Sequence, residues 1–184
     1  MSKRYVLCLT AANRTGILAA VAKALSELGG DIHEISHTTV ADYFALILAA
    51  DFPERRAPDV IVSHVEGVCR PFGVEVILKD PAHEPADEVA AVKSQPYVLN
   101  LTGRDAPGIV ARISGCLARE GIDVSHLHGI RRDGGKSFAL ALSLAVPADV
   151  DVATLQKELE QIGQSLGFSP DLKRAAEQGS TSGL

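Results

Sequence analysis

The spacing of hydrophobic residues in the first half of the chain predicts an alternation of short strands and helices. The segment 5–10 alternates as a half-buried strand does. After a polar loop at 13–16, apolar residues recur at helical spacing over 17–28, and the glycine pair at 29–30 predicts the end of this helix. The remaining predicted elements are strands at 31–40, 43–52 and 74–78 and a helix at 58–72.

The same pattern returns in the second half, so the chain contains an internal duplication. Residues 97–102 repeat residues 5–10 with a single difference, and the register then holds at an offset of 92. The offset rises to 94 because the segment 131–136 is two residues longer than its counterpart, and its glycine pair predicts a hairpin tip. Pro170 interrupts the last predicted strand, so we expect that strand to be short or irregular.

Each copy is predicted to form an α+β, ferredoxin-like βαββαβ unit, with a four-stranded antiparallel sheet and two helices on one face. We expect a first domain at 1–79, a linker at 80–95, a second domain at 96–174 and a disordered tail at 175–184. The linker segment carries two prolines and several acids, and the tail is small and polar. A duplicated unit of this size is typical of a regulatory module.

Composition and charge remove several classes of function. A formal net charge of -5 argues against direct nucleic-acid binding. Because no apolar run reaches the roughly 18 residues of a membrane span, we expect no membrane partner and a cytoplasmic protein. The cysteines Cys8, Cys69 and Cys116 do not form a paired motif, so we interpret them as small apolar core residues.

Catalytic and metal-binding signals are weak. The sequence contains neither a nucleophile-elbow nor a phosphate-loop motif, and no segment of about 100 residues remains for a catalytic domain. His126 and His128 share a strand face, but their counterparts Glu34 and Ser36 do not continue a ligand set. We therefore expect no enzyme activity, no cofactor and no metal site.

The most informative polar residues lie in the loops before the first helix of each copy. A helix N-terminus offers unpaired N–H groups and a partial positive charge, which suit the carboxylate of an amino acid. Asp31 and Asp123 begin the second strands, where a carboxylate could accept hydrogen bonds from an ammonium group. A simpler interpretation stays open, in which Asn13 and Asp105 only cap helices and the two aspartates only serve turns.

These loops carry a resemblance to a known family. Asn13–Gly16 followed by Gly29–Ile32, and Asp105–Gly108 followed by Gly121–Val124, resemble the loop and strand entry of ACT domains. The tandem layout resembles the glycine cleavage system transcriptional repressor group. The resemblance implies a ligand at an interface between two domains, and it implies contact residues Asn13, Arg14, Thr15, Gly16, Asp31 and Ile32 in the first copy and Asp105, Ala106, Pro107, Gly108, Asp123 and Val124 in the second.

The two copies depart from the family pattern in different ways. Thr15 stands in place of the usual proline, and Ala106 in place of the usual arginine. Serine-binding relatives have a polar side chain two residues before the loop asparagine, where this chain has Ala11 and Gly103. A specificity for serine is therefore not expected.

The resemblance favours a non-enzymatic sensor that binds a small amino acid such as glycine and modulates a protein partner. A DNA-binding regulator is one candidate partner, because this acidic chain has no DNA-binding surface of its own. The open strand edges favour a homodimer. Two alternatives remain: the regulatory subunit of an amino-acid or folate metabolic enzyme, and an ACT interaction module without a ligand.

Overall fold

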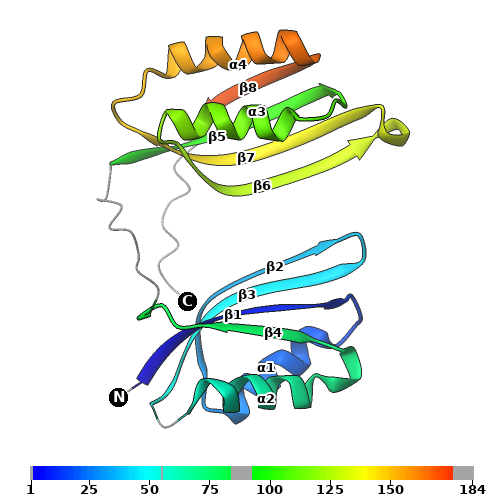
Figure 1. Ribbon diagram of the computed structural model, residues 1–184, viewed down its shortest axis with the longest axis vertical. Coiled ribbons are helices and arrows are strands. Elements are labelled where there is room, and N and C mark those ends of the chain that lie inside the picture. The colour runs from blue at the N-terminus through cyan, green and yellow to red at the C-terminus, as the bar shows by residue number, and fades with distance from the viewer. Residues whose placement is uncertain (1, 55, 84–92, 176–184) are drawn as a thin grey trace. The chain divides into compact units, whose positions relative to one another are not determined.

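The computed structural model describes residues 2–54, 56–83 and 93–175 (Figure 1). The chain divides into two compact units, Met1–Glu88 and Val89–Leu184, called unit 1 and unit 2 below. The expected linker and the expected tail lie for the most part outside the described residues. The exact domain limits therefore stay a prediction.

Unit 1 has the predicted element order. Its first four elements are β1 (Ser2–Ala12), α1 (Ile17–Glu27), β2 (Asp31–Val40) and β3 (Tyr43–Pro53). They are followed by α2 (Pro58–Val68), the short 3-10 helix η1 (Arg70–Phe72) and β4 (Glu75–Lys79). The strands form an antiparallel sheet in the order β2-β3-β1-β4. Both helices cover the same face of this sheet (Figure 1).

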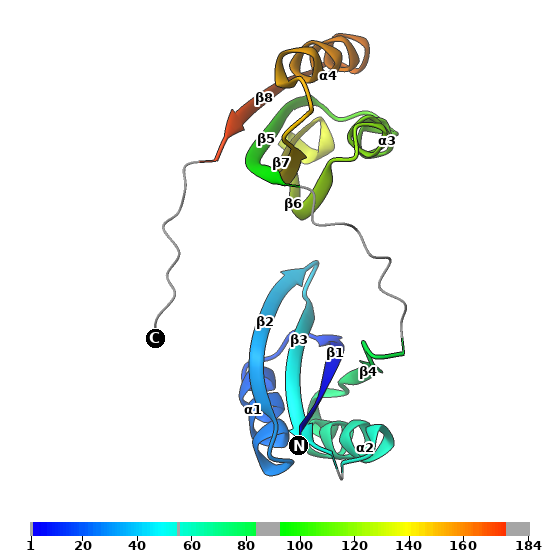
Figure 2. The same ribbon diagram turned by 90° about the vertical axis from the view of Figure 1, so that its left-hand side faces the viewer.

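Unit 2 repeats this arrangement. Its elements are β5 (Ser94–Arg104), α3 (Ile109–Arg119), β6 (Asp123–Arg132), the 3-10 turn η2 (Asp133–Gly135), β7 (Ser137–Pro147), α4 (Val152–Leu166) and β8 (Phe168–Arg174). The sheet order is β6-β7-β5-β8, again antiparallel. Within unit 2, α3 and α4 cover one sheet face (Figure 2). The predicted fold class is confirmed in both units.

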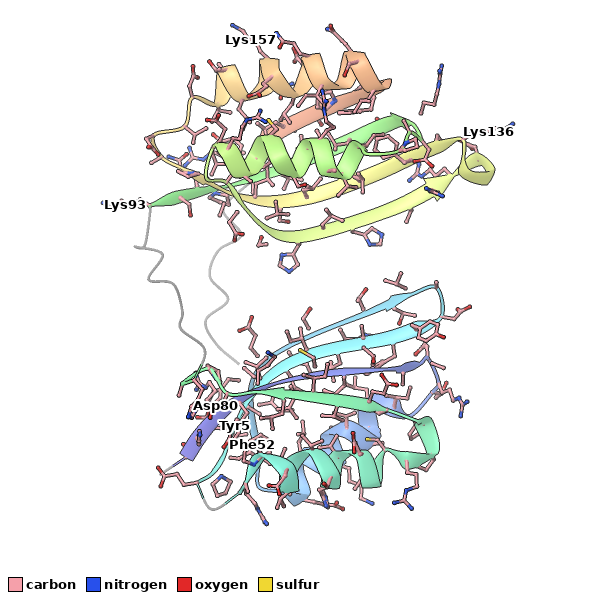
Figure 3. The ribbon with its side chains drawn as sticks, viewed as in Figure 1. Tyr5, Phe52, Asp80, Lys93, Lys136 and Lys157 are labelled. Atoms are coloured by element: carbon pink, nitrogen blue, oxygen red, sulfur yellow. The ribbon has the colours of Figure 1, made fainter. Side chains whose placement is uncertain are left out.

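Each unit has its own hydrophobic core between sheet and helices. In unit 1 the inward residues of β1 pack against Ile17, Val21 and Leu25 of α1, and the positions equivalent to these three are also buried in unit 2. Tyr5 and Phe52 close one end of the first core with ring centroids 6.2 Å apart (Figure 3). No helix in the described part of the chain is long and apolar enough to cross a membrane.

Two expectations about element lengths were wrong. The helix expected over 58–72 ends at Val68 and continues as η1, because Pro71 lacks an N–H and its ring would clash with the carbonyl four residues earlier. The last strand was expected to be short, yet β8 has 7 residues against 5 in β4. Pro170 is tolerated because β8 is an edge strand, and the register continues through its pairing with Leu101.

The hairpin tips differ as the two-residue insertion predicts. In unit 1 the tip consists of Ala41 and Asp42 with φ of 47° and 65°, as in the mirror-image turns of tight hairpins. In unit 2 the tip is η2, where Gly134 and Gly135 have φ of 65° and 91°. Each tip lies beside the loop before the first helix of its own unit.

Candidate functional site

The loop between β1 and α1 is fastened to the neighbouring hairpin. The backbone N–H of Asn13 donates to the carbonyl of Asp42 at 2.8 Å. In unit 2 the N–H of Asp105 donates to the carbonyl of Lys136 at 3.0 Å, and Lys136 marks this tip in Figure 3. Both loops are therefore placed by the same backbone contact.

Each loop enters its helix through a glycine in the left-handed region. Gly16 has φ of 100° and Gly108 has φ of 86°, and both occupy the N-cap position without a side-chain cap. The interpretation of Asn13 and Asp105 as helix-capping side chains is therefore wrong. A Cβ atom on Gly16 would also lie 3.4 Å from the ring of Phe72, so a glycine brings the backbone close to η1 without strain.

The first turns of α1 and α3 present free donors. Among the described residues, no acceptor is recorded for the backbone N–H groups of Leu18 and Ala19 in α1, or of Val110 and Ala111 in α3. Such groups carry the partial positive charge of a helix N-terminus. Their geometry suits an anion such as a carboxylate.

In unit 1 the arginine of the loop is directed to η1. Arg14 Nη1 donates to the carbonyl of Pro71 at 3.3 Å, and Thr15 next to it is exposed. The side-chain amide of Asn13 makes no hydrogen bond with any residue in the described ranges. This loop therefore keeps a neutral polar group available beside the free helix donors.

In unit 2 the loop makes an ion pair with its own sheet. Asp105 Oδ2 lies 3.0 Å from Arg131 Nε on β6. Ala106 packs partly buried against the core, and Pro107 is exposed. Sequence reasoning missed Arg131, although a signal exists: at the same offset of 92, the first copy has its arginine in the loop and Thr39 on the strand.

Asp31 and Asp123 lie far from these loops within their own units. Asp31 pairs with Asp51 at one end of the sheet, whereas Ala12 pairs with Tyr43 at the other end, next to Asn13. A strand of this length spans about 30 Å at about 3.3 Å per residue. A single unit therefore does not bring the two halves of the expected amino-acid site together. Asp123 has the equivalent place, pairing with Ala145.

The start of β2 carries a charged cluster that sequence reasoning also missed. Arg4 Nε donates to Asp51 Oδ1 at 2.7 Å, and His33 Nε2 lies 3.0 Å from Asp51 Oδ2. The Arg4 hydrogen bond holds the pKa of Asp51 below its usual range. The corresponding residues of unit 2 are Pro96, Ala145 and Ser125, so this cluster has no counterpart there.

The residues two positions before Asn13 and Asp105 leave no room for a further polar side chain at either loop. Ala11 is buried in the core of unit 1, and a Cβ on Gly103 would meet the Gly167 carbonyl oxygen at 2.5 Å. Neither position can present a polar side chain to a ligand. Ile32 is 37% exposed, while Val124 packs against the core of unit 2.

Other chemistry-bearing groups do not assemble into a site. Within the described ranges, no three His, Cys, Asp or Glu side chains are placed to hold a metal ion. Cys69 and Cys116 are buried, and burial raises the pKa of both thiols. Cys8 does not fit the interpretation as a core residue, because it is only half-buried and lies on the sheet face opposite the helices.

A groove of about 550 Å³ lies between α3 and α4. Its polar lining includes Arg112, Arg119, Glu158 and Gln161, and Arg119 is paired with Glu158. Gly115 also lines the groove and has no side chain to fill it. The equivalent residue of unit 1 is Lys23.

The duplicated fold and its loops agree with the comparisons with known proteins. The model of the ACT domain matches residues 95–173. A UPF0237 protein from Methanocaldococcus jannaschii is 38% identical over 71 residues, which cover 38% of this chain and 77% of the relative. One from Corynebacterium glutamicum is 41% identical over 49 residues, 27% of this chain and 55% of the relative, so the match spans about half of its length. The chain therefore belongs to the family of the UPF0237 proteins, and its residues 95–173 match an ACT domain.

Two solved structures share the tandem fold over nearly the whole chain. A crystal structure of an unknown protein from Galdieria sulphuraria has a TM-score of 0.78 at 19% identity, covering 96% of this chain and all (100%) of that one. A candidate glycine cleavage system transcriptional repressor has a TM-score of 0.63 at 15% identity, covering 95% and 99%. At these identities the likeness concerns the fold alone.

Proposed function

We propose that this protein is an amino-acid-sensing regulator that binds a small amino acid, such as glycine, at its ACT loops. The observation that carries the proposal is the loop of unit 1, where Gly16 exposes free N–H groups of α1 beside the unengaged amide of Asn13. The helix end suits the carboxylate of the ligand. A small ligand such as glycine suits this loop, because Arg14 holds the loop close to η1.

The ammonium group of the ligand needs an acceptor from a second ACT unit. Asp31 is exposed at the opposite end of β2 from the loop of its own unit, and β2 is an edge strand. Antiparallel pairing of β2 with the β2 of a second copy would bring Asp31 of one copy level with the hairpin tip and loop of the other. This arrangement supports a homodimer in which the ligand binds at the interface between copies.

Regulation would follow from a difference in ligand affinity between two arrangements of the copies. A protein partner would read that difference, and an acidic chain with a net charge of -5 favours a partner that supplies any DNA-binding surface itself. Control of glycine or one-carbon metabolism at transcription is the finer form of this proposal. It follows the description of the repressor neighbour.

A thermal-shift screen of the full chain against common amino acids tests this function. A ligand at 100 times its Kd adds about 2.7 kcal/mol to the free energy of unfolding. Asn13→Ala and Asp31→Ala should each reduce the shift, because they remove the polar group of the loop and the acceptor of the ammonium. His126→Ala and His128→Ala are matched controls and should leave it unchanged.

The outcomes separate the candidate functions. A saturable shift that Asn13→Ala and Asp31→Ala abolish supports the sensor. Equal thermal shifts in all four variants would mean that the ligand binds at a site without Asn13 and Asp31. No shift with any amino acid at millimolar concentration would leave an ACT interaction module without a ligand.

A further inference from the structure

The two loops differ in whether their polar side chain is already engaged. Asp105 is held by Arg131, whereas Asn13 has no side-chain partner among the described residues. Arg131 pairs with Phe138 in the sheet, and the matching residue Thr39 pairs with Phe44. The register is therefore the same in both units, and only the side chain on the strand changes.

The arginine that makes a contact beside the loop comes from a different element in each unit. In unit 1, Arg14 comes from the loop and donates to the Pro71 carbonyl. In unit 2, Ala106 takes the place of Arg14, and the guanidinium comes from β6 instead. Only in unit 2 does the arginine contact the polar residue of the loop.

We infer that Arg131 determines which of the two loops receives the amino-acid effector, by closing the loop of unit 2 with an internal ion pair. This inference rests on the proposed function. The Asp105 carboxylate places a full negative charge near the helix end that would otherwise attract the carboxylate of the ligand. The Asp105 carboxylate could also accept hydrogen bonds from the ammonium group of the ligand, but Arg131 is already paired with it. Both charges of a zwitterion are thus already present in unit 2.

The loop of unit 1 has no such ion pair. Asn13 is neutral and Thr39 brings no cation, while the N–H groups of Leu18 and Ala19 are free, as those of Val110 and Ala111 are in unit 2. The Arg131 side chain is 75% exposed and that of Asp105 22% exposed, so solvent weakens the pair. We therefore expect a preference for unit 1 of about fivefold in affinity, the ratio that a pair worth up to about 1 kcal/mol produces.

An NMR titration of the full chain with glycine, alanine and serine tests the inference. The backbone amides of Gly16 and Gly108 report on the two loops separately. In the wild type, the Gly16 signal should shift at a lower amino-acid concentration than that of Gly108. The double variant Asp105→Asn with Arg131→Thr gives unit 2 the residues of unit 1, so Gly108 should respond about fivefold more sensitively.

The reciprocal variant, Asn13→Asp with Thr39→Arg, should weaken the Gly16 response by a similar factor. Equal responses of Gly16 and Gly108 in the wild type would overturn the selection of one loop while leaving the sensor function intact. Silence of both amides, in the wild type and in both double variants, would instead overturn the proposed function.

A measurement without ligand tests the ion pair by itself. Arg131→Thr should speed hydrogen exchange of the backbone amides of Asp105, Ala106 and Gly108, because the loop loses its contact with β6. Arg132→Thr is the matched control, since this neighbour on β6 makes no ion pair within the described ranges. The same exchange rates in both variants would overturn the role of Arg131, whatever the amino-acid titration shows.

Discussion

Unit 1 and unit 2 have the same strand order and register, yet equivalent surface positions carry different chemistry. The two helices of unit 1 are joined by Glu27 and His64 at 2.9 Å. The equivalent residues of unit 2, Arg119 and Glu158, form an ion pair in which the glutamate comes from the other helix. The fold therefore accommodates a polar contact at this place with the acidic residue on either helix.

The sheet faces opposite the helices have diverged further. In unit 1, Cys8 lies between Ile47 and Ile77 in one cross-strand row, and the two isoleucines are 48% and 60% exposed. The equivalent row of unit 2 contains Ala141, Asn100 and Asp171. Most core-facing residues stayed apolar in both copies while outward-facing residues changed, and the two loops are among the parts that changed.

The largest expected effect comes from the cores, which the two units hold in common. Leu48 and Leu142 are equivalent and only 2% and 3% exposed, so either Leu→Ala change should cost about 2–5 kcal/mol in the unfolding of its own unit. Hydrogen exchange during denaturation, read separately for each unit, measures this cost. Leu18→Ala at an exposed position is the control. Equal destabilisation of both units by one change would contradict separate cores.

Gly103→Ala should have the next largest effect, and only in unit 2. Its Cβ would lie 2.5 Å from the Cα of Phe168, so β5 and β8 would have to separate at a cost of about 1–3 kcal/mol. The equivalent residue of unit 1 is already an alanine, Ala11. Gly115→Ala is a suitable control, because nothing lies within 4 Å of its added Cβ. Similar midpoints of denaturation for both variants would refute the close approach.

Helix capping distinguishes the second helices by about 1 kcal/mol. Asp151 caps α4 by accepting a hydrogen bond from Ala153 N at 3.0 Å, whereas Ala57 leaves α2 without a side-chain cap. We expect Asp151→Ala to destabilise unit 2 by about 1 kcal/mol and Ala57→Asp to stabilise unit 1 by up to that amount. Urea denaturation of both variants measures these differences. A destabilising Ala57→Asp change would show that α2 cannot use a cap.

The smallest expected effect is on the stability of unit 1 at low pH. Arg4 lowers the pKa of Asp51, so their contact stabilises unit 1 above the unfolded pKa of about 4 and is lost as pH falls through the lower folded pKa. Unit 2 has Ala145 at this place. Arg4→Ala should therefore flatten the acid side of the stability profile of unit 1 alone. Thermal melts between about pH 2 and pH 6 test this, and an unchanged profile would contradict it.

Local periodicity was sufficient to predict the element order, because burial alternates along each strand and follows one face of each helix. The end of α2 at Val68 and the length of β8 were missed because single prolines act through their position in the helix or at the sheet edge. The ion pair of Asp105 with Arg131 depends on strand register. That register includes a bulge between Val124 and His126, which no local pattern reveals.

The expected site residues were only partly brought together for a similar reason. The loops and helix ends are local features, and the structure has them at the predicted residues. Asp31 is set by topology at the far end of the sheet from Asn13. A site that contains both Asn13 and Asp31 would need two units, and the hydrophobic pattern of one chain does not predict how units assemble.

Isothermal titration calorimetry of the full chain with glycine and other small amino acids tests the central claim most directly. We predict saturable binding in which one tighter site per chain fills first in the wild type. Asn13→Ala should strongly weaken this tighter site, and Ala106→Ser in the loop of unit 2 should leave it unaffected. Heats equal to dilution for every amino acid at millimolar concentration would contradict the account.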